Sequence, residues 1–432
     1  MTSLSIILAV LIFSAIILFH EFGHYLLARR NGIKVVEFSL GMGPRVFSVV
    51  KGETRYSVKC FPLGGSCMML DELGEDSGEK GSFASASVWS KIAVVAAGPV
   101  FNFILAFLLS LIIVGAAGYD EPIVTDVPED SAVYEAGLQA GDRIIRYDGY
   151  AIDVSRDLYI YLYLNPPKVD QQINMTVLRD GEKVKISYMP DVSYRYLLGF
   201  NRTGTDSMTV ESLIPGLPLE DAGVLPGDRI VAVGGVRIED GYAYDEYLKD
   251  HPLTDEPLEI IYERNGLEYE TEIIPKQYRQ VSRGFSYSMA YQKAAALSVV
   301  PHALIEVKYM IRSTLLSLKE LVRGKVGVEE LSGPIGVVSA IDDTYQESKS
   351  LGIVAIIINL LNMAVLLSAN LGVMNLLPIP ALDGGRLVLL IVEAIRRKPL
   401  NQEIEGRIHF AGFILLMILM VFVMFNDVIK LI

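Results

Sequence analysis

Long apolar segments alternate with polar ones along this chain, and four of them are long enough to cross a bilayer. They run from about Leu4 to Ala28, Ile92 to Ala117, Leu351 to Leu377 and Ile408 to Phe425. Each approaches the ~20 residues that a spanning helix needs. Asn362, Asn370 and Asn375 make the third segment unusually polar, so we expect it to face protein rather than lipid. The pattern predicts a multi-pass α-helical membrane protein with four transmembrane helices.

The polar middle of the chain contains an internal repeat. Residues Ala136–Ile145 are echoed by Ala222–Val231, and both copies follow the pattern A-G-x-x-x-G-D-R-I. Alternating, strand-like runs accompany each copy. A repeat of this length predicts two copies of a small domain rather than a solenoid. The pattern resembles the PDZ domain in its bacterial protease-associated form, which binds extended segments or C-termini by strand addition. Two structural spacers that bind nothing are the alternative.

Two imidazoles and a carboxylate interrupt the first apolar segment, at His20, Glu21 and His24. Ionisable groups at membrane depth are costly and indicate function. Because residues i and i+4 share a helix face, both histidines can bind one metal ion with Glu21 beside them. This is the H-E-x-x-H pattern, in which two histidines bind zinc and the glutamate is the general base. It predicts hydrolysis by metal-activated water. The alternative is a pair of helix-end histidines at the lipid headgroups.

A catalytic zinc site usually has three protein ligands, so a third is needed. Asp383 is the best candidate, because Pro378 and Pro380 break the third segment near the depth of the two histidines. Broken helix at this depth is buried in protein or lines a wet cavity. A helix N-cap is the alternative role for Asp383, and His409, at the start of the last segment, is the alternative ligand.

Other residue types change this picture little. Cys60 and Cys67 are too few for a disulfide framework, and a zinc site built from them with the histidines would be closed to water. The formal net charge is −13 and no basic cluster indicates nucleic-acid binding. Cations follow the first segment, precede the second and lie between the third and fourth. The N-terminus, the middle region and the C-terminus are therefore expected outside, with the metal motif near the cytoplasmic side.

Taken together, these motifs resemble the site-2 proteases, a family of intramembrane zinc metalloproteases. The similarity is greatest to the bacterial regulator-of-sigma-E protease group with tandem PDZ domains. Besides the first motif, it rests on Leu376–Gly385, Gly98–Asn102 and Phe38–Pro44, and on the order of the spans around the PDZ insertion. The resemblance implies one Zn²⁺ per chain, held by His20, His24 and Asp383, with Glu21 as the base that moves the proton.

The resemblance also implies how a substrate is held. A substrate helix must unwind before it is cut, and its freed backbone needs partners. Asn375 offers a donor and an acceptor just ahead of the break. Asn375, Pro378 and Pro380 are therefore expected to bind the substrate. A helix-packing asparagine is the alternative.

A second substrate-binding element is expected at residues 55–65, which read as a strand ending in a turn at Gly64 and Gly65. In the family, a membrane-associated β-hairpin at this place pairs with the extended substrate. A re-entrant structural loop is the alternative.

We expect five parts along the chain. They are an N-terminal membrane part (1–118), a first PDZ domain (119–200), a second PDZ domain (201–278), an amphipathic helix and linker (279–350) and a C-terminal membrane part (351–432). The expected function is a zinc endopeptidase of the bacterial inner membrane that cleaves single-span proteins, such as anti-sigma factors already trimmed outside, or remnant signal peptides. A non-catalytic PDZ receptor or adaptor with a structural metal is the alternative.

Overall fold

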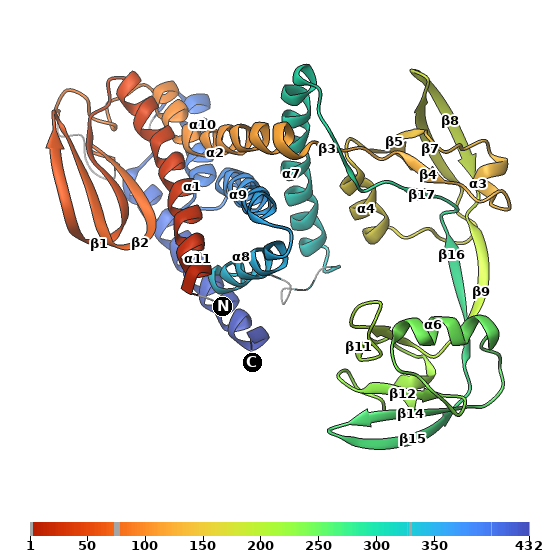
Figure 1. Cartoon of the computed structure of the whole chain (residues 1–432). Helices are drawn as coiled ribbons and strands as arrows, with labels where there is room; N and C mark the ends of the chain where they lie inside the picture. The colour runs from red at the N-terminus through yellow and green to blue at the C-terminus, as the bar shows by residue number, and fades with distance from the viewer. Residues whose placement is uncertain (1–2, 73–77, 326, 328–330, 399, 432) are drawn as a thin grey trace. The chain divides into compact units, whose positions relative to one another are not determined.

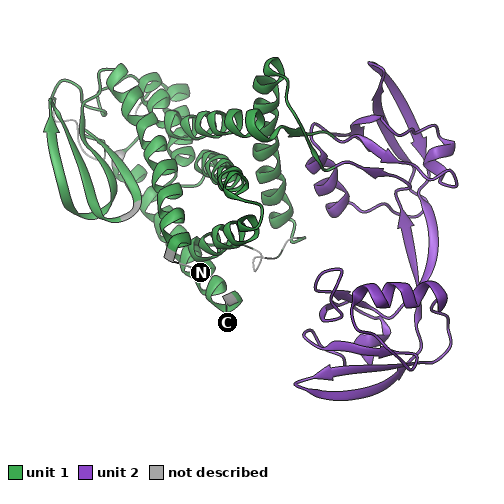
Figure 2. Ribbon diagram, viewed as in Figure 1, with its two compact units in different colours: residues 1–121, 289–432 green, residues 122–288 purple. Residues whose placement is uncertain are grey.

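The computed structural model describes residues 3–72, 78–325, 327, 331–398 and 400–431 (Figure 1). The chain forms two compact units, which are coloured separately in Figure 2. The first unit comprises residues 1–121 and 289–432, and the second comprises residues 122–288. The first therefore contains the long apolar segments and the second contains the internal repeat.

Helices make up most of the first unit. They are α1 (Ser3–Arg30), α2 (Val88–Ala117), the 3-10 helix η1 (Ala296–Ser298), α7 (Val299–Val322), α8 (Pro334–Lys349), α9 (Ile353–Leu376), α10 (Asp383–Arg396) and α11 (Gln402–Leu431). Among the described residues, α1, α2, α9 and α11 are long and apolar enough to cross a membrane, as predicted. The central helix is α2, which packs against α1, α7, α9 and α10.

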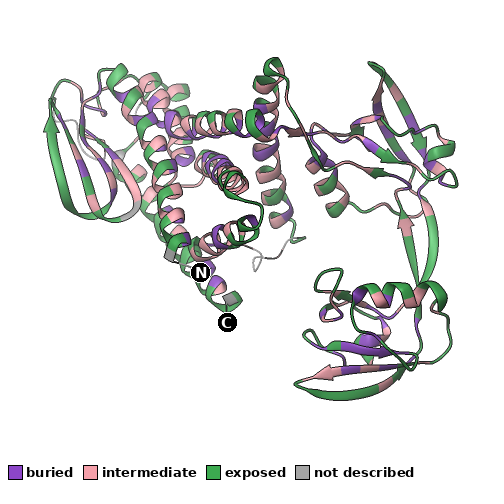
Figure 3. Cartoon of the chain, viewed as in Figure 1, coloured by how far each residue is buried: buried purple, intermediate pink, exposed green. Residues whose placement is uncertain are grey.

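The burial of the spanning helices suits a lipid environment. Only 11% of the most apolar window of α11 is buried inside the protein, and Figure 3 shows how the exposed residues are distributed. Such an apolar exposed face is expected to contact lipid. Asn370 of α9 instead has a protein partner, since it accepts a hydrogen bond from Thr314 of α7 at 2.5 Å.

The predicted break in the third span lies between α9 and α10. The spanning helix ends at Leu376, just before Pro378 and Pro380, and α10 begins at Asp383. Proline cannot donate to the helical ladder, which explains the end of α9. Gly384 then allows α10 to start immediately beside the end of α9, because a Cβ there would overlap the main-chain atoms of Leu376 and Leu377.

A β-hairpin follows α1 and consists of β1 (Val35–Lys51) and β2 (Thr54–Met69). The turn expected at Gly64 and Gly65 is wrong, because β2 continues past both glycines and the hairpin reverses between Lys51 and Thr54. The glycines bend the strand instead, and the φ angle of Gly64 is 96°. Residues 37–40 consequently pair both with residues 55–58 and with residues 65–68. The hairpin is thus folded over on itself, and residues 65–69 form one of its edges.

The second unit contains two lobes with the same strand order. The first lobe comprises β4 (Val124–Asp126), α3 (Ala132–Glu135), β5 (Arg143–Tyr147), β6 (Tyr150–Ala151), α4 (Ser155–Leu164), β7 (Ile173–Arg179), β8 (Glu182–Tyr188) and β17 (Ser286–Tyr287). The second comprises β10 (Phe200–Arg202), β11 (Val210–Leu213), α5 (Pro218–Asp221), β12 (Arg229–Val233), β13 (Val236–Arg237), α6 (Gly241–Asp250), β14 (Leu258–Arg264) and β15 (Leu267–Ile273). Their sheets have the orders β6-β5-β7-β8 and β13-β12-β14-β15.

The chain enters and leaves each lobe through paired strands. A ladder of β9 (Asp191–Leu197) with β16 (Lys276–Ser282) leads to the second lobe and back. Phe285, which follows this ladder, belongs to the core of the first lobe, so the second lobe is inserted within the first. In the first unit, β3 (Tyr119–Asp120) likewise pairs with β18 (Tyr291–Gln292).

The repeated sequence pattern has a structural cause. In the first lobe, Arg179 donates to Asp142 at 2.7 Å and to the carbonyl of Gly137. In the second lobe, Arg264 makes the same contacts with Asp228 and Gly223. Each aspartate also accepts a backbone N–H three residues earlier in the chain. The glycine and aspartate of the pattern therefore build one ion-pair network around a buried aspartate in each lobe.

Candidate metal centre

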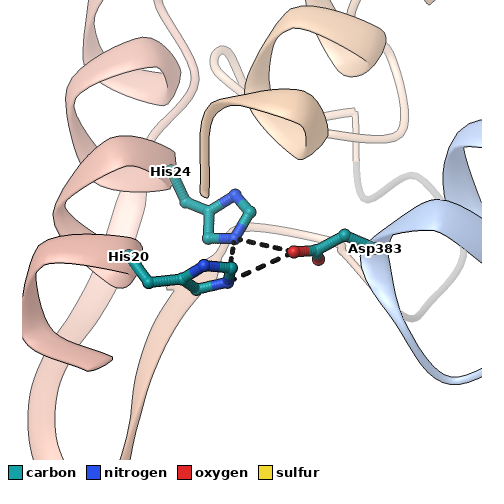
Figure 4. A group of neighbouring side chains, drawn as sticks. All are labelled: His20, His24 and Asp383. Atoms are coloured by element: carbon teal, nitrogen blue, oxygen red, sulfur yellow. Dashed lines mark hydrogen bonds and ion pairs between the residues drawn. The ribbon is translucent and has the colours of Figure 1, made fainter. Parts of the chain in front are cut away.

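His20, His24 and Asp383 converge at one point in the first unit (Figure 4). The two Nε2 atoms are 3.2 Å apart. Oδ2 of Asp383 lies 3.2 Å from Nε2 of His20 and 3.5 Å from Nε2 of His24. Ligand atoms about 2.0–2.1 Å from a tetrahedral zinc ion are separated by roughly 3.3 Å. The three atoms therefore have the mutual spacing of three zinc ligands, and a tetrahedron leaves its fourth position for water.

Burial supports the same interpretation. His20 and His24 are buried, and Oδ2 of Asp383 is a buried oxygen with no hydrogen-bond partner of good geometry. A buried acceptor without a donor is destabilising, and a bound cation would satisfy it. Within the described ranges, this is the one cluster of three or more such side chains that could hold a metal ion. The donor set of two nitrogens and one oxygen fits zinc.

Three elements position these ligands. Helical spacing on α1 places both imidazoles on one face, and the start of α10 presents Asp383 to them. The third element, α2, was not assigned a role from the sequence. Its Val94 carbonyl lies 2.8 Å from Nδ1 of His24, and the amide of Asn102 lies 3.1 Å from Nδ1 of His20. An asparagine within an apolar segment was the signal available from the sequence.

Glu21 lies beside the three ligands and against the hairpin. Its carboxylate is close to both histidines and to Asp383, and it lies near the backbone N–H of Cys67. A Cβ on Gly65 would be 3.1 Å from Cγ of Glu21, so this glycine packs directly on the glutamate. Gly64 faces Met42 instead.

The other predicted substrate-binding residues lie farther along the broken helix. Asn375 is half-buried in the last turn of α9, and Pro378 is exposed. Pro380 lies against Gly412 of α11. A cavity of about 590 Å³ opens beside Asp383, between α10 and α11. Of the described residues that line it, none is Asn375, Pro378 or Pro380.

The residues considered as alternative ligands do not join the cluster. Nδ1 of His409 accepts a hydrogen bond from the backbone N–H of Ala381 at 3.1 Å. Cys60 is exposed and Cys67 is buried, and both are free cysteines. Cys67 is near Glu21, yet its sulfur is not part of the metal cluster in the described chain.

Comparison with known proteins agrees with this geometry. The model of Peptidase family M50 matches residues 8–419. The chain belongs to this family. The expected membership of the site-2 proteases is therefore confirmed, and the protein is a zinc metalloprotease of the membrane.

Two relatives of this M50 peptidase cover nearly its whole length. The zinc metalloprotease RasP of Geobacillus kaustophilus is 30% identical over 99% of this chain and 98% of its own. The regulator of sigma-W protease RasP of Bacillus subtilis is 28% identical over 98% of both chains. Among solved structures, the PDZ domain of HtrA3 with a phage-derived ligand covers 21% of this chain at 21% identity, and its TM-score of 0.17 supports no conclusion about the fold.

Proposed function

We propose that this peptidase cuts single-span membrane proteins near the cytoplasmic side of the bilayer, with one zinc ion held by His20, His24 and Asp383. The observation that carries the proposal is the set of three ligand atoms, spaced 3.2–3.5 Å apart, that α1 and α10 bring together. The N-terminus, the second unit and the C-terminus are on the extracytoplasmic side, as the flanking cations indicate.

Glu21 is the general base. Zinc, when bound, is a Lewis acid that activates water and polarises the scissile carbonyl. Glu21 takes a proton from the attacking water and passes it to the leaving amine. The backbone N–H of Cys67 lies near the Glu21 carboxylate, and Gly65 leaves room for its side chain. The hairpin edge thus positions the base as well as flanking the site.

The same hairpin edge is suited to hold the unwound substrate. Residues 65–69 form an edge of the folded-over hairpin next to Glu21. An extended segment can add to such an edge through its main chain, which gives affinity for many sequences. A second set of contacts to the substrate backbone would come from the end of α9, where Asn375 precedes Pro378 and Pro380.

The two lobes of the second unit are PDZ domains that act as a size filter. Their shared strand order and shared ion-pair network support this assignment. They admit membrane proteins whose outer part has already been trimmed, and they exclude intact ones. Anti-sigma factors are the proposed substrate class, in keeping with the name of the Bacillus subtilis relative. Remnant signal peptides are a second class of trimmed single-span chains.

A Glu21→Gln variant tests the catalytic assignment. Purified full-length protein is incubated with a single-span model substrate, and zinc content is measured in the same preparation. We expect the variant to retain zinc and to lose cleavage by at least ~100-fold, as expected for loss of a general base. Glu403→Gln, which alters an exposed carboxylate of α11, is the control and should cleave normally. Cleavage by Glu21→Gln at the wild-type rate would refute the assignment and leave the adaptor alternative standing.

A further inference from the structure

The interface between α2 and α1 contains buried polar contacts that helix packing alone does not require. Asn102 is completely buried, and its side-chain amide lies 3.1 Å from Nδ1 of His20. Its own main-chain carbonyl accepts a hydrogen bond from Ser368 of α9 at 2.8 Å. Gly98, one turn earlier, faces both imidazole rings. A buried amide at membrane depth is costly, so its contact with a metal ligand indicates a function.

The contact made by His24 shows what a zinc ligand needs on its second nitrogen. Nδ1 of His24 faces the carbonyl of Val94 at 2.8 Å. A carbonyl oxygen can only accept, so Nδ1 carries the hydrogen and donates it. The lone pair of Nε2 is then directed toward Asp383, where a metal ion would be. Metal-binding histidines generally donate their other ring N–H in this way.

The contact made by His20 can be formed in two ways, because the amide of Asn102 carries an acceptor at one end and a donor at the other. If Nδ2 donates to Nδ1 of a neutral His20, the ring hydrogen lies on Nε2 and blocks metal binding. If the amide is turned by 180°, Oδ1 accepts from Nδ1–H and Nε2 is free. As placed, Oδ1 of Asn102 is buried without a partner. In this orientation the acceptor end of the amide is unsatisfied and the metal site is blocked, so the metal requirement favours the turned amide.

We propose that Asn102 is a positioning residue whose Oδ1 accepts the hydrogen of His20 Nδ1, which fixes the ring and leaves Nε2 free for zinc. This inference rests on the proposed zinc site. In this arrangement, α2 supplies both ring acceptors, Val94 for His24 and Asn102 for His20. The Gly98–Asn102 element, which the sequence offered only as a mark of the family resemblance, then supports the metal centre.

Substitutions at position 102 can distinguish whether the side chain acts toward His20 as a hydrogen-bond acceptor or as a donor. Asn102→Asp keeps the shape and provides only acceptors, whereas Asn102→Leu keeps approximate size and provides neither. Zinc affinity is measured on the full-length protein in detergent by competition with a chromophoric chelator, and thermal unfolding is followed in parallel. Ser110→Ala is the matched control, since Ser110 is another buried polar residue of α2. Wild type and His20→Ala complete the set.

We expect Asn102→Leu to bind zinc about 10–100-fold more weakly, the usual effect of losing such a partner. Asn102→Asp and Ser110→Ala should bind like wild type, or Asn102→Asp more tightly. Wild-type affinity in Asn102→Leu overturns the inference, and so does an Asn102→Asp protein as weak as Asn102→Leu, which would show that the amide donates. If Asn102→Leu does not fold, the affinity of Asn102→Asp decides alone. If His20→Ala binds zinc like wild type, the proposed zinc site itself is wrong.

Discussion

Gly98 of α2 lies directly against His24 of α1, and a Cβ at position 98 would overlap the imidazole at Nε2. The same Cβ would be 2.7 Å from Cε1 of His20. Backbone of α2 therefore forms one wall of the metal centre. The absence of a side chain at this position lets both rings approach the helix and reach Asp383.

A methyl group at position 98 should displace the rings. Gly98→Ala is expected to weaken zinc binding by at least ~10-fold and to lower cleavage in proportion, because a small misplacement of catalytic groups has large effects. Gly115→Ala in the same helix is the control, since a Cβ there meets no neighbouring atom within 4 Å. Equal zinc affinity in both variants would contradict this, because it would mean that α1 and α2 can move apart without weakening zinc binding.

Loss of Arg264 should destabilise the second lobe. Asp228 is buried, and Arg264→Met would leave its carboxylate without the guanidinium. Removing the cationic partner of a buried carboxylate should lower the free energy of unfolding clearly, because the charge left behind has no equivalent partner. Arg237→Met removes an exposed pair with Glu268 in the same lobe and should cost less than ~1 kcal/mol. Limited proteolysis of the full-length protein reports both, and equal sensitivity of the two variants would contradict the network.

The same pair predicts how stability depends on pH. The guanidinium of Arg264 holds the pKa of Asp228 below its usual range. The folded state therefore favours the ionised carboxylate, so this stabilisation is fully present above the unfolded pKa of about 3.9. It is lost as the pH falls through the lower folded pKa. As the pH falls from about 5 to about 3, a range that includes the unfolded pKa of Asp228, wild type should lose more resistance to proteolysis than Arg264→Met. A parallel loss in both would exclude this cause.

Removal of the second unit should abolish the preference for trimmed substrates. The β3–β18 pair holds the chain ends together in the first unit, so residues 122–288 can be replaced by a short glycine linker. The shortened enzyme should cut intact and trimmed forms of a single-span substrate at similar rates, while wild type prefers the trimmed form. Zinc content shows that the catalytic unit has survived. An unchanged preference would mean that the lobes are not the filter.

The sequence predicted the parts of the site that depend on local spacing and membrane depth. The four apolar lengths gave the spans, and the helical repeat placed His20 beside His24. The break after Leu376 indicated Asp383 because prolines end a helix wherever it packs. These inferences need no knowledge of which helix packs on which.

Contacts between residues far apart in the sequence could not be predicted from local spacing. Gly64 and Gly65 have the composition of a turn, yet β2 continues past them because residues 65–68 pair with residues 37–40. Phe285 joins the core of the first lobe after the whole second lobe. Asp427, near the end of α11, accepts backbone hydrogen bonds from Gly333 and Gly336 at 3.0 and 2.8 Å. Only the folded chain brings these partners together.

The zinc affinity of an Asp383→Asn variant tests the central claim most directly. Asp343→Asn, at an exposed carboxylate of α8, is the control. Wild type and the control should each bind one zinc ion, and X-ray absorption should show two imidazole ligands. Asp383→Asn should bind zinc more weakly by more than the ~10–100-fold that outer-shell changes cause. If Asp383→Asn binds zinc as tightly as wild type, the metal is not held by these three side chains.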